Sequence, residues 1–168
     1  MRTVKLLGLF ALLAVVAFAP LAAQEDVEGS KDHPLFARRP GYFISAYDHK
    51  DLDSFEFRGK DGKPVKVEGL KTEITYRLKD GVAAAFPLEI VRAYQDAVTK
   101  AGGAFLFQAV EPAGGLTTLR LDKDGNQVWA QVLVGENGND IRLTIVEKVE
   151  AKKKSLPETP GKPAADRG

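Results

Sequence analysis

The sequence contains no cysteine and is poor in the other side chains that most often carry chemistry. Its 168 residues include two histidines, one tryptophan and one methionine. The absence of cysteine excludes thiol nucleophiles, thiolate metal centres and a lipid-modified N-terminal cysteine. It also excludes a disulfide-linked partner. Any histidine-based site must therefore use His33 or His49.

The chain also lacks an excess of charge of one sign. It has 24 basic and 23 acidic residues, and its formal net charge is +1. Proteins that bind nucleic acid carry a clustered excess of basic residues, so the composition argues against a nucleic-acid partner. With 44% hydrophobic and 28% charged residues, the chain has the composition of a globular protein rather than of a disordered or collagen-like one.

One long apolar run occurs at the N-terminus. Arg2 and Lys5 precede an unbroken run of 14 apolar residues, 6–19, and small residues lead to Ala23 before the chain becomes polar. A membrane-spanning helix needs about 20 apolar residues, so the run is too short for a comfortable anchor. The order of basic, apolar and small residues predicts a secretory signal peptide over residues 1–23, cleaved near Ala23. An uncleaved N-terminal anchor is the alternative.

The C-terminal end has a different composition. Residues 151–168 contain a lysine triplet, three prolines and one large apolar residue, Leu156. Such a stretch buries too little apolar surface to offset its ordering entropy, so we expect a disordered, basic, proline-rich tail. The tail is compatible with peripheral association with an anionic membrane or polymer, although a solubilising role is the simpler interpretation.

Between these ends, residues 24–150 show the patterning of a single α+β domain. Apolar and polar residues alternate over most of the stretch, which predicts a mostly antiparallel, twisted sheet of about seven strands. Turn residues at 124–126 and 136–139 join neighbouring strands as hairpins. The expected strands cover residues 42–47, 54–58, 65–78, 105–109, 119–121, 128–134 and 141–145.

One segment has helical spacing instead. Pro87 is suited to the first helical position, and a single apolar stripe follows it. Gly102 and Gly103 follow the stripe, and glycine readily adopts the left-handed backbone conformation that ends many helices. The sequence therefore predicts one helix over about residues 87–101, packed on one face of the sheet.

The third expected strand contains a change of phase. Its apolar residues occupy odd positions before Gly69 and even positions after it. A glycine at such a point is typical of a β-bulge or a bend.

Few residues are candidates for metal binding or catalysis. His49 lies among Asp48, Asp51 and Asp53, so four potential cation ligands occur close together. Aspartates also favour turns, and we favour the interpretation of a solvated loop between two strands that holds no metal. Residues 122–126 begin like a calcium loop but lack its later glycine and glutamate. No cofactor is predicted.

Trp129 is the most conspicuous candidate for binding. The apolar face of its strand contains residues 128, 130, 132 and 134, which places Trp129 on the opposite face. A tryptophan there has two interpretations. It is either an exposed surface on which a sugar or a partner protein stacks, or a buried side chain that fills a second small core under the N-terminal segment. Together with Tyr47, His33 and Arg39, it forms the predicted contact surface.

Several blocks of the sequence resemble a region of bacterial OmpA-family cell-envelope proteins. The most distinctive block is DVEGSKDHPLF at 26–36, which is followed by RPGY at 39–42. GLKTEITYRL at 69–78, PLEIVRAY at 87–94 and KAGG at 100–103 resemble later parts of the same region. In that family the region follows the signal peptide and opens an N-terminal domain of uncharacterised function.

This resemblance covers about residues 26–149 and implies a Gram-negative cell-envelope protein. The implied location is the periplasm, or the periplasmic side of the outer membrane. In the family this domain usually precedes a peptidoglycan-binding domain, and no stretch of the present sequence matches that second domain. No peptidoglycan-contacting residue is therefore carried over from the family.

Together these features favour an exported, non-enzymatic module that binds or assembles with an envelope protein or a cell-wall polymer. One alternative is a carrier of a small lipid or sugar, with a cavity lined by Phe105, Phe107, Tyr94 and Ile74. A less favoured alternative is a small exported hydrolase that uses His49 with the neighbouring aspartates.

Export gives the first testable prediction. Mass spectrometry of the protein purified from its native host should show a mature chain that begins near Gln24, because cleavage is expected after Ala23. A membrane-bound species that retains Met1 would instead support the uncleaved anchor.

Overall fold

The protein is described here by a computed structural model that covers residues 24–123 and 125–149. The predicted signal peptide (1–23) and tail (151–168) lie outside the described residues. The elements in chain order are β1 (Tyr42–Arg58), β2 (Pro64–Leu78), α1 (Pro87–Lys100), β3 (Ala104–Glu111), β4 (Gly114–Lys123), β5 (Asn126–Gly135), the short 3₁₀ turn η1 (Glu136–Gly138) and β6 (Asp140–Val149).

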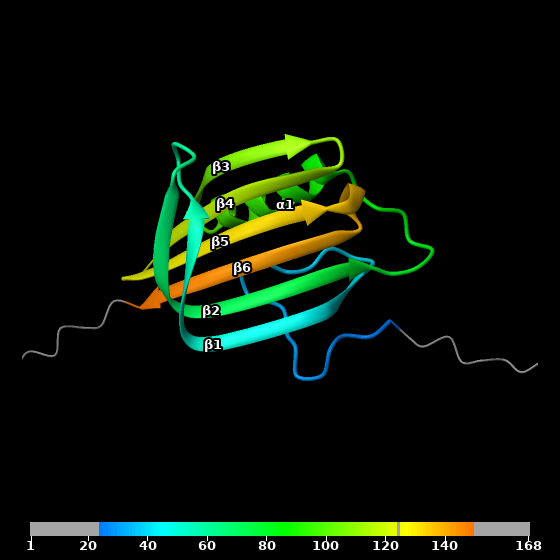
Figure 1. Cartoon of the computed structure of the whole chain (residues 1–168), viewed down its shortest axis with the longest axis horizontal. Coiled ribbons are helices and arrows are strands. Elements are labelled where there is room, and N and C mark those ends of the chain that lie inside the picture. Colours follow the sequence, from blue (N-terminus) through cyan, green and yellow to red (C-terminus); the bar gives the residue numbers. More distant parts are fainter. Residues whose placement is uncertain (1–23, 124, 150–168) are drawn as a thin grey trace, which may run out of the picture.

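The strands form one antiparallel sheet in the order β1-β2-β6-β5-β4-β3, and α1 lies across one of its faces (Figure 1). This confirms the predicted α+β class and the helix. The described part has six strands rather than about seven. In the same part of the chain, no helix is long and apolar enough to cross a membrane.

The difference in strand number arises in β1. The two runs expected at 42–47 and 54–58 belong to one strand, which contains register shifts at Ile44/Ala46 and at Lys50/Asp53. The stretch around His49 is exposed to solvent, as predicted, but it belongs to a strand, so the prediction of a loop is wrong. Pairing with β2 keeps this polar stretch extended, because sheet context overrides the turn preference of the aspartates.

Helix α1 begins and ends as its sequence suggests. Pro87 occupies the start of the helix, where no backbone donor is needed, and Glu89 and Lys100 carry charges that suit the two ends. Gly102 has a φ of +92°, and its N–H donates to the carbonyl of Thr99 to close the last turn. The buried side of α1 packs on β3, β4 and β5.

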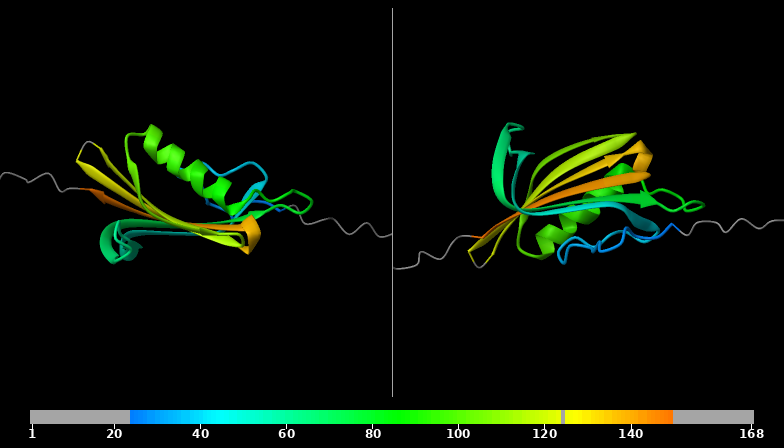
Figure 2. Two further views of the ribbon diagram at one scale, coloured as in Figure 1. Left: turned by 90° about the horizontal axis from the view of Figure 1, so that it is seen from above. Right: turned by 60° about the horizontal axis from the view of Figure 1, so that its bottom comes forward.

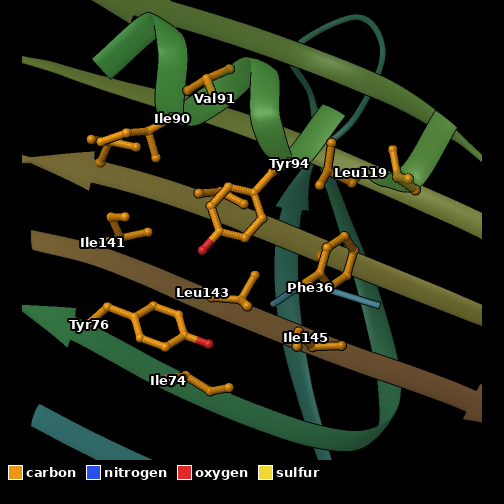
Figure 3. Close-up of a cluster of buried hydrophobic side chains, with 14 of the residues drawn as sticks. Phe36, Ile74, Tyr76, Ile90, Val91, Tyr94, Leu119, Ile141, Leu143 and Ile145 are labelled. Carbon is orange, nitrogen blue, oxygen red and sulfur yellow. The ribbon is translucent and has the colours of Figure 1, made fainter. Parts of the chain in front are cut away.

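The main core lies between the sheet, α1 and the N-terminal segment, residues 24–41, which runs along the same face of the sheet as the helix (Figure 2). Tyr94 of α1 and Phe36 of the N-terminal segment extend over the sheet residues Leu143 and Ile145 (Figure 3). The Tyr94 and Phe36 ring centroids are 6.2 Å apart. Burying these aromatic side chains together with the aliphatic ones supplies the main stabilisation of the fold.

A second, smaller core lies on the other face of the sheet. The far half of the long β1–β2 hairpin curls over that face (Figure 2). There Phe57 and Val67 of the hairpin pack against Trp129 and Val146 of the sheet. The sheet is therefore covered on both faces, by α1 and the N-terminal segment on one side and by the hairpin on the other.

Gly69 lies where the hairpin leaves the sheet. Pairing between β2 and β6 ends at Leu70, while pairing between β2 and β1 continues through Gly69. A Cβ atom at position 69 would lie 2.4 Å from the carbonyl oxygen of Glu147. Because only glycine allows this approach of two backbones, the bend predicted at Gly69 is confirmed.

The close approach predicts a marked loss of stability in Gly69→Ala. The added methyl group meets backbone rather than a flexible side chain, so the hairpin must shift, and we expect a loss of about 1–3 kcal/mol in the free energy of unfolding. Urea unfolding, monitored by the fluorescence of Trp129, measures this loss. The neighbouring exposed variant Glu68→Ala is the control, and equal stability of the two variants would contradict the role given to Gly69.

Candidate functional site

An open pocket of about 330 Å³ lies between the N-terminal segment and the β1, β2 and β6 part of the sheet. It is on the face that carries α1. We call it the His33–Glu147 pocket. Its lining residues are Lys31, Asp32, His33, Pro34, Tyr47, His49, Leu70, Thr72 and Glu147. Both histidines of the protein therefore lie in one pocket, although they are 16 positions apart in the sequence.

Arg38 fixes the wall of the pocket that the N-terminal segment provides. Its guanidinium group contacts the carboxylates of Asp32, at 2.8 Å, and of Asp26. Asp26 in turn accepts the backbone N–H of Ile44 in β1, and Asp32 accepts the hydroxyl of Tyr76 in β2 at 2.9 Å. These charge-assisted hydrogen bonds tie the segment to two strands of the sheet.

His33 is held in one orientation by its own segment. The backbone N–H of Leu35 donates to its Nδ1 at 3.2 Å, and its ring stacks on Phe36 with centroids 5.5 Å apart. Because Nδ1 accepts this bond, the neutral ring carries its proton on Nε2. Nε2 lies 3.6 Å from Oε1 of Glu147. The pocket thus presents an imidazole donor beside a carboxylate acceptor.

His49 enters the pocket from β1. Its Nδ1 is 2.9 Å from the hydroxyl oxygen of Thr72, while its Nε2 is 4.0 Å from Asp51. The other two nearby aspartates, Asp48 and Asp53, contact lysines instead. Within residues 24–123 and 125–149, no three His, Asp or Glu side chains gather closely enough to hold a metal ion.

Two carboxylates at this site have altered pKa values. The imidazole of His33, whose Nε2 lies 3.6 Å from Oε1 of Glu147, lowers the pKa of Glu147, although partial burial opposes the shift. The bond from Arg38 lowers the pKa of Asp26 in the same way, against a smaller burial effect. Both carboxyl groups are therefore held in the charged form at neutral pH.

The predicted contact surface divides between two parts of the structure. His33 and Tyr47 line the pocket, whereas Arg39 does not. Trp129 is 6% exposed, and its ring centroid is 5.6 Å from that of Phe57 in the second core. This burial removes the interpretation of Trp129 as a stacking platform and supports that of a second core. The cover comes from the β1–β2 hairpin, however, and not from the N-terminal segment.

The cavity expected for a ligand carrier does not form from the residues proposed for it. Phe105 is 53% exposed on β3, while Ile74 is fully buried on β2. Three strands separate β2 from β3 in the sheet. The interior between sheet and helix is filled by the main core instead.

Sequence reasoning missed Glu147 and Arg38. Glu147 continues the inward-facing series of Ile141, Leu143 and Ile145 along β6, so an acidic residue at a core-facing position was the available signal. Arg38 carries no comparable signal. Its partners Asp26 and Asp32 are identified only once the N-terminal segment has folded back on itself.

A second hollow, of about 480 Å³, lies at the other end of the sheet beside the β2–α1 connection. Its charged lining residues are two cationic and two anionic side chains, Arg77, Lys79, Asp80 and Asp140, and it contains no histidine. The balanced charges do not point to one class of ligand. The His33–Glu147 pocket is therefore the better candidate site.

Comparison with known proteins does not assign this site. No protein-family model matches the chain, and no curated protein matches it.

The lowered pKa values predict a pH-dependent attachment of the N-terminal segment. A carboxyl group with a lowered folded-state pKa stabilises the structure above its ordinary pKa, and this stabilisation is lost as the pH falls through the lowered value. We therefore expect protection of the Ile44 amide, which donates to Asp26, to weaken below about pH 4.

Amide hydrogen exchange measured by NMR tests this expectation. Asp26→Asn should reduce the protection of the Ile44 amide at neutral pH. It should also make that protection depend less on pH in the acid range. Asp61→Asn, which removes another low-pKa carboxyl group but lies in the β1–β2 turn, is the matched control. A wild-type protection factor that stays constant into acid would contradict the prediction.

Proposed function

We propose that the protein is an exported, non-enzymatic binding module of the cell envelope, and that the His33–Glu147 pocket is its binding site. The observation that carries the proposal is the pocket itself. It gathers the phenol ring of Tyr47, two imidazoles and two carboxylates from the N-terminal segment and separate strands. Such convergence of polar groups in a concave surface is typical of ligand sites.

The chemistry of the lining favours a polyhydroxylated ligand. Glu147 offers acceptor oxygens and His33 offers an Nε2–H donor, while the Tyr47 side chain supplies an aromatic surface. Sugar hydroxyls need both donors and acceptors, and the apolar face of a sugar ring packs on aromatic side chains. At about 330 Å³, the pocket is at the small end of the range for small-molecule sites. We therefore propose the glycan of a cell-wall polymer as its ligand.

The geometry favours binding over hydrolysis. The pocket does bring an imidazole and a carboxylate together, as a hydrolase would require, although the carboxylate is Glu147 rather than one of the predicted aspartates. The Nδ1 lone pair of His33 is occupied by the Leu35 N–H, however, and its Nε2 carries the proton. In this state His33 donates a hydrogen bond but does not remove a proton from a nucleophile.

The location rests on two features of the sequence. The basic, apolar and small-residue order of residues 1–23 supports export, and the similarity of residues 26–149 to a domain of OmpA-family proteins supports the envelope. An exported chain on the periplasmic side meets cell-wall polymers directly, which agrees with the proposed glycan ligand.

Calorimetric titration with soluble peptidoglycan fragments tests the proposal. Wild-type protein should bind them, and Glu147→Gln and Tyr47→Ala should each weaken the affinity about tenfold, because a charged acceptor or an aromatic contact is lost. Arg39→Ala is the control, since Arg39 was predicted for binding but does not line the pocket.

Two results would contradict the proposal. Absence of binding by the wild-type protein would exclude this glycan as the ligand, and an equal loss in Arg39→Ala would exclude this pocket as the site. Cleavage of the fragments by wild-type protein but not by Glu147→Gln would show that the pocket hydrolyses the glycan, which would overturn the proposed non-enzymatic function.

A further inference from the structure

The edge strand β3 has a free side. In the part of the chain that the structure describes, β3 pairs with β4 alone and ends the sheet (Figure 1). Its residues 104–110, AFLFQAV, contain no charge and no proline, and Glu111 is its one charged residue. Phe105 is 53% exposed. Natural sheets usually protect an edge of this kind with lysine, proline or a covering segment.

The opposite edge of the sheet shows such protection. The backbone N–H of Val27 donates to the carbonyl of Ile44 in β1, so the N-terminal segment covers part of that edge. Further along, β1 carries Lys50 and several aspartates. The contrast between the two edges indicates that β3 is the edge left open for pairing.

The hydrogen bonds of β4 show which backbone groups of β3 face outward. The carbonyl oxygen of Phe107 accepts the hydroxyl of Thr117 in β4 at 2.9 Å, so it faces the sheet. In a trans peptide the N–H points opposite to the carbonyl, and the chain has no cis peptide among the described residues. The N–H of Gln108 therefore faces the free side.

Gln108 is suited to a two-fold axis. An antiparallel pair centred on it makes the two copies of Gln108 a hydrogen-bonded pair through their outward backbone groups. A two-fold axis normal to the sheet keeps the same faces aligned, so Phe107 of one copy lies across from Ala109 of the other. This sets a large side chain beside a small one and keeps Glu111 away from the axis.

We infer that this protein forms a symmetric dimer through antiparallel pairing of β3 with β3 of a second copy. The two six-stranded sheets become one continuous sheet, with both α1 helices on the same face. The His33–Glu147 pocket lies on the β1, β2 and β6 side, away from the pairing edge, so the inference is independent of the proposed function. The C-terminal residues 151–168 are a poor alternative occupant because their three prolines do not suit an added strand.

A single introduced cysteine tests the dimer, because the chain has none of its own. In a hydrogen-bonded antiparallel pair the Cα atoms are about 5.5 Å apart, which a disulfide spans. Gln108→Cys should therefore form a covalent dimer readily under mild oxidation. Glu56→Cys, another exposed strand position, in the hairpin, is the control and should stay monomeric on a reducing-agent-free gel.

Light scattering provides the second measurement. The fraction of dimer in the wild-type protein should grow with concentration. Gln108→Pro should abolish the dimer, because proline removes the outward N–H that the monomer does not use. Should Gln108→Pro fail to fold, Ala109→Lys provides the same test by placing charge at the interface. A wild-type monomer at high concentration, a dimer that survives these substitutions, or equal cross-linking of Glu56→Cys would overturn the inference.

Discussion

The arrangement of the candidate site depends on the contacts of Arg38 with Asp26 and Asp32. The N-terminal segment has neither a helix nor a long strand to hold it, so its position is set by these ion pairs, by Phe36 in the core and by the bond from Ile44 to Asp26. Ion pairs of partly exposed groups stabilise little on their own. Here they matter because both carboxylates also bind the sheet, so one arginine fixes the wall of the pocket.

The sheet carries a separate core on each of its two faces, because the faces are covered by different parts of the chain. On one face, α1 and the N-terminal segment enclose the main core and leave the His33–Glu147 pocket at their margin. On the other face, the curled hairpin encloses Trp129. The bend at Gly69 makes this second cover possible, because β2 has to pass close over the backbone of β6. The proposed binding site is thereby separated from the elements that complete the second core.

The sequence predicted the regular elements well where local signals agree. The helix was recognised from Pro87 and its apolar stripe, and the bend from the change of phase at Gly69. The polar stretch around His49 was misassigned as a loop because aspartates favour turns locally, whereas pairing with β2 holds them in a strand. The contact surface was predicted only in part, since His33 and Tyr47 line the pocket but Trp129 is buried beneath a hairpin that folds back over it.

By itself the sequence determined the α+β class, the antiparallel hairpins and the position of the helix, because these follow from periodicity and turn residues within short windows. Tertiary structure alone decided that His33, His49 and Glu147 share one pocket, and that Trp129 lies in a core rather than on a surface. The physical reason is the same in both cases. Contacts between distant segments depend on strand order and on which part of the sheet the bent hairpin reaches, and neither is encoded in the local alternation of apolar and polar residues.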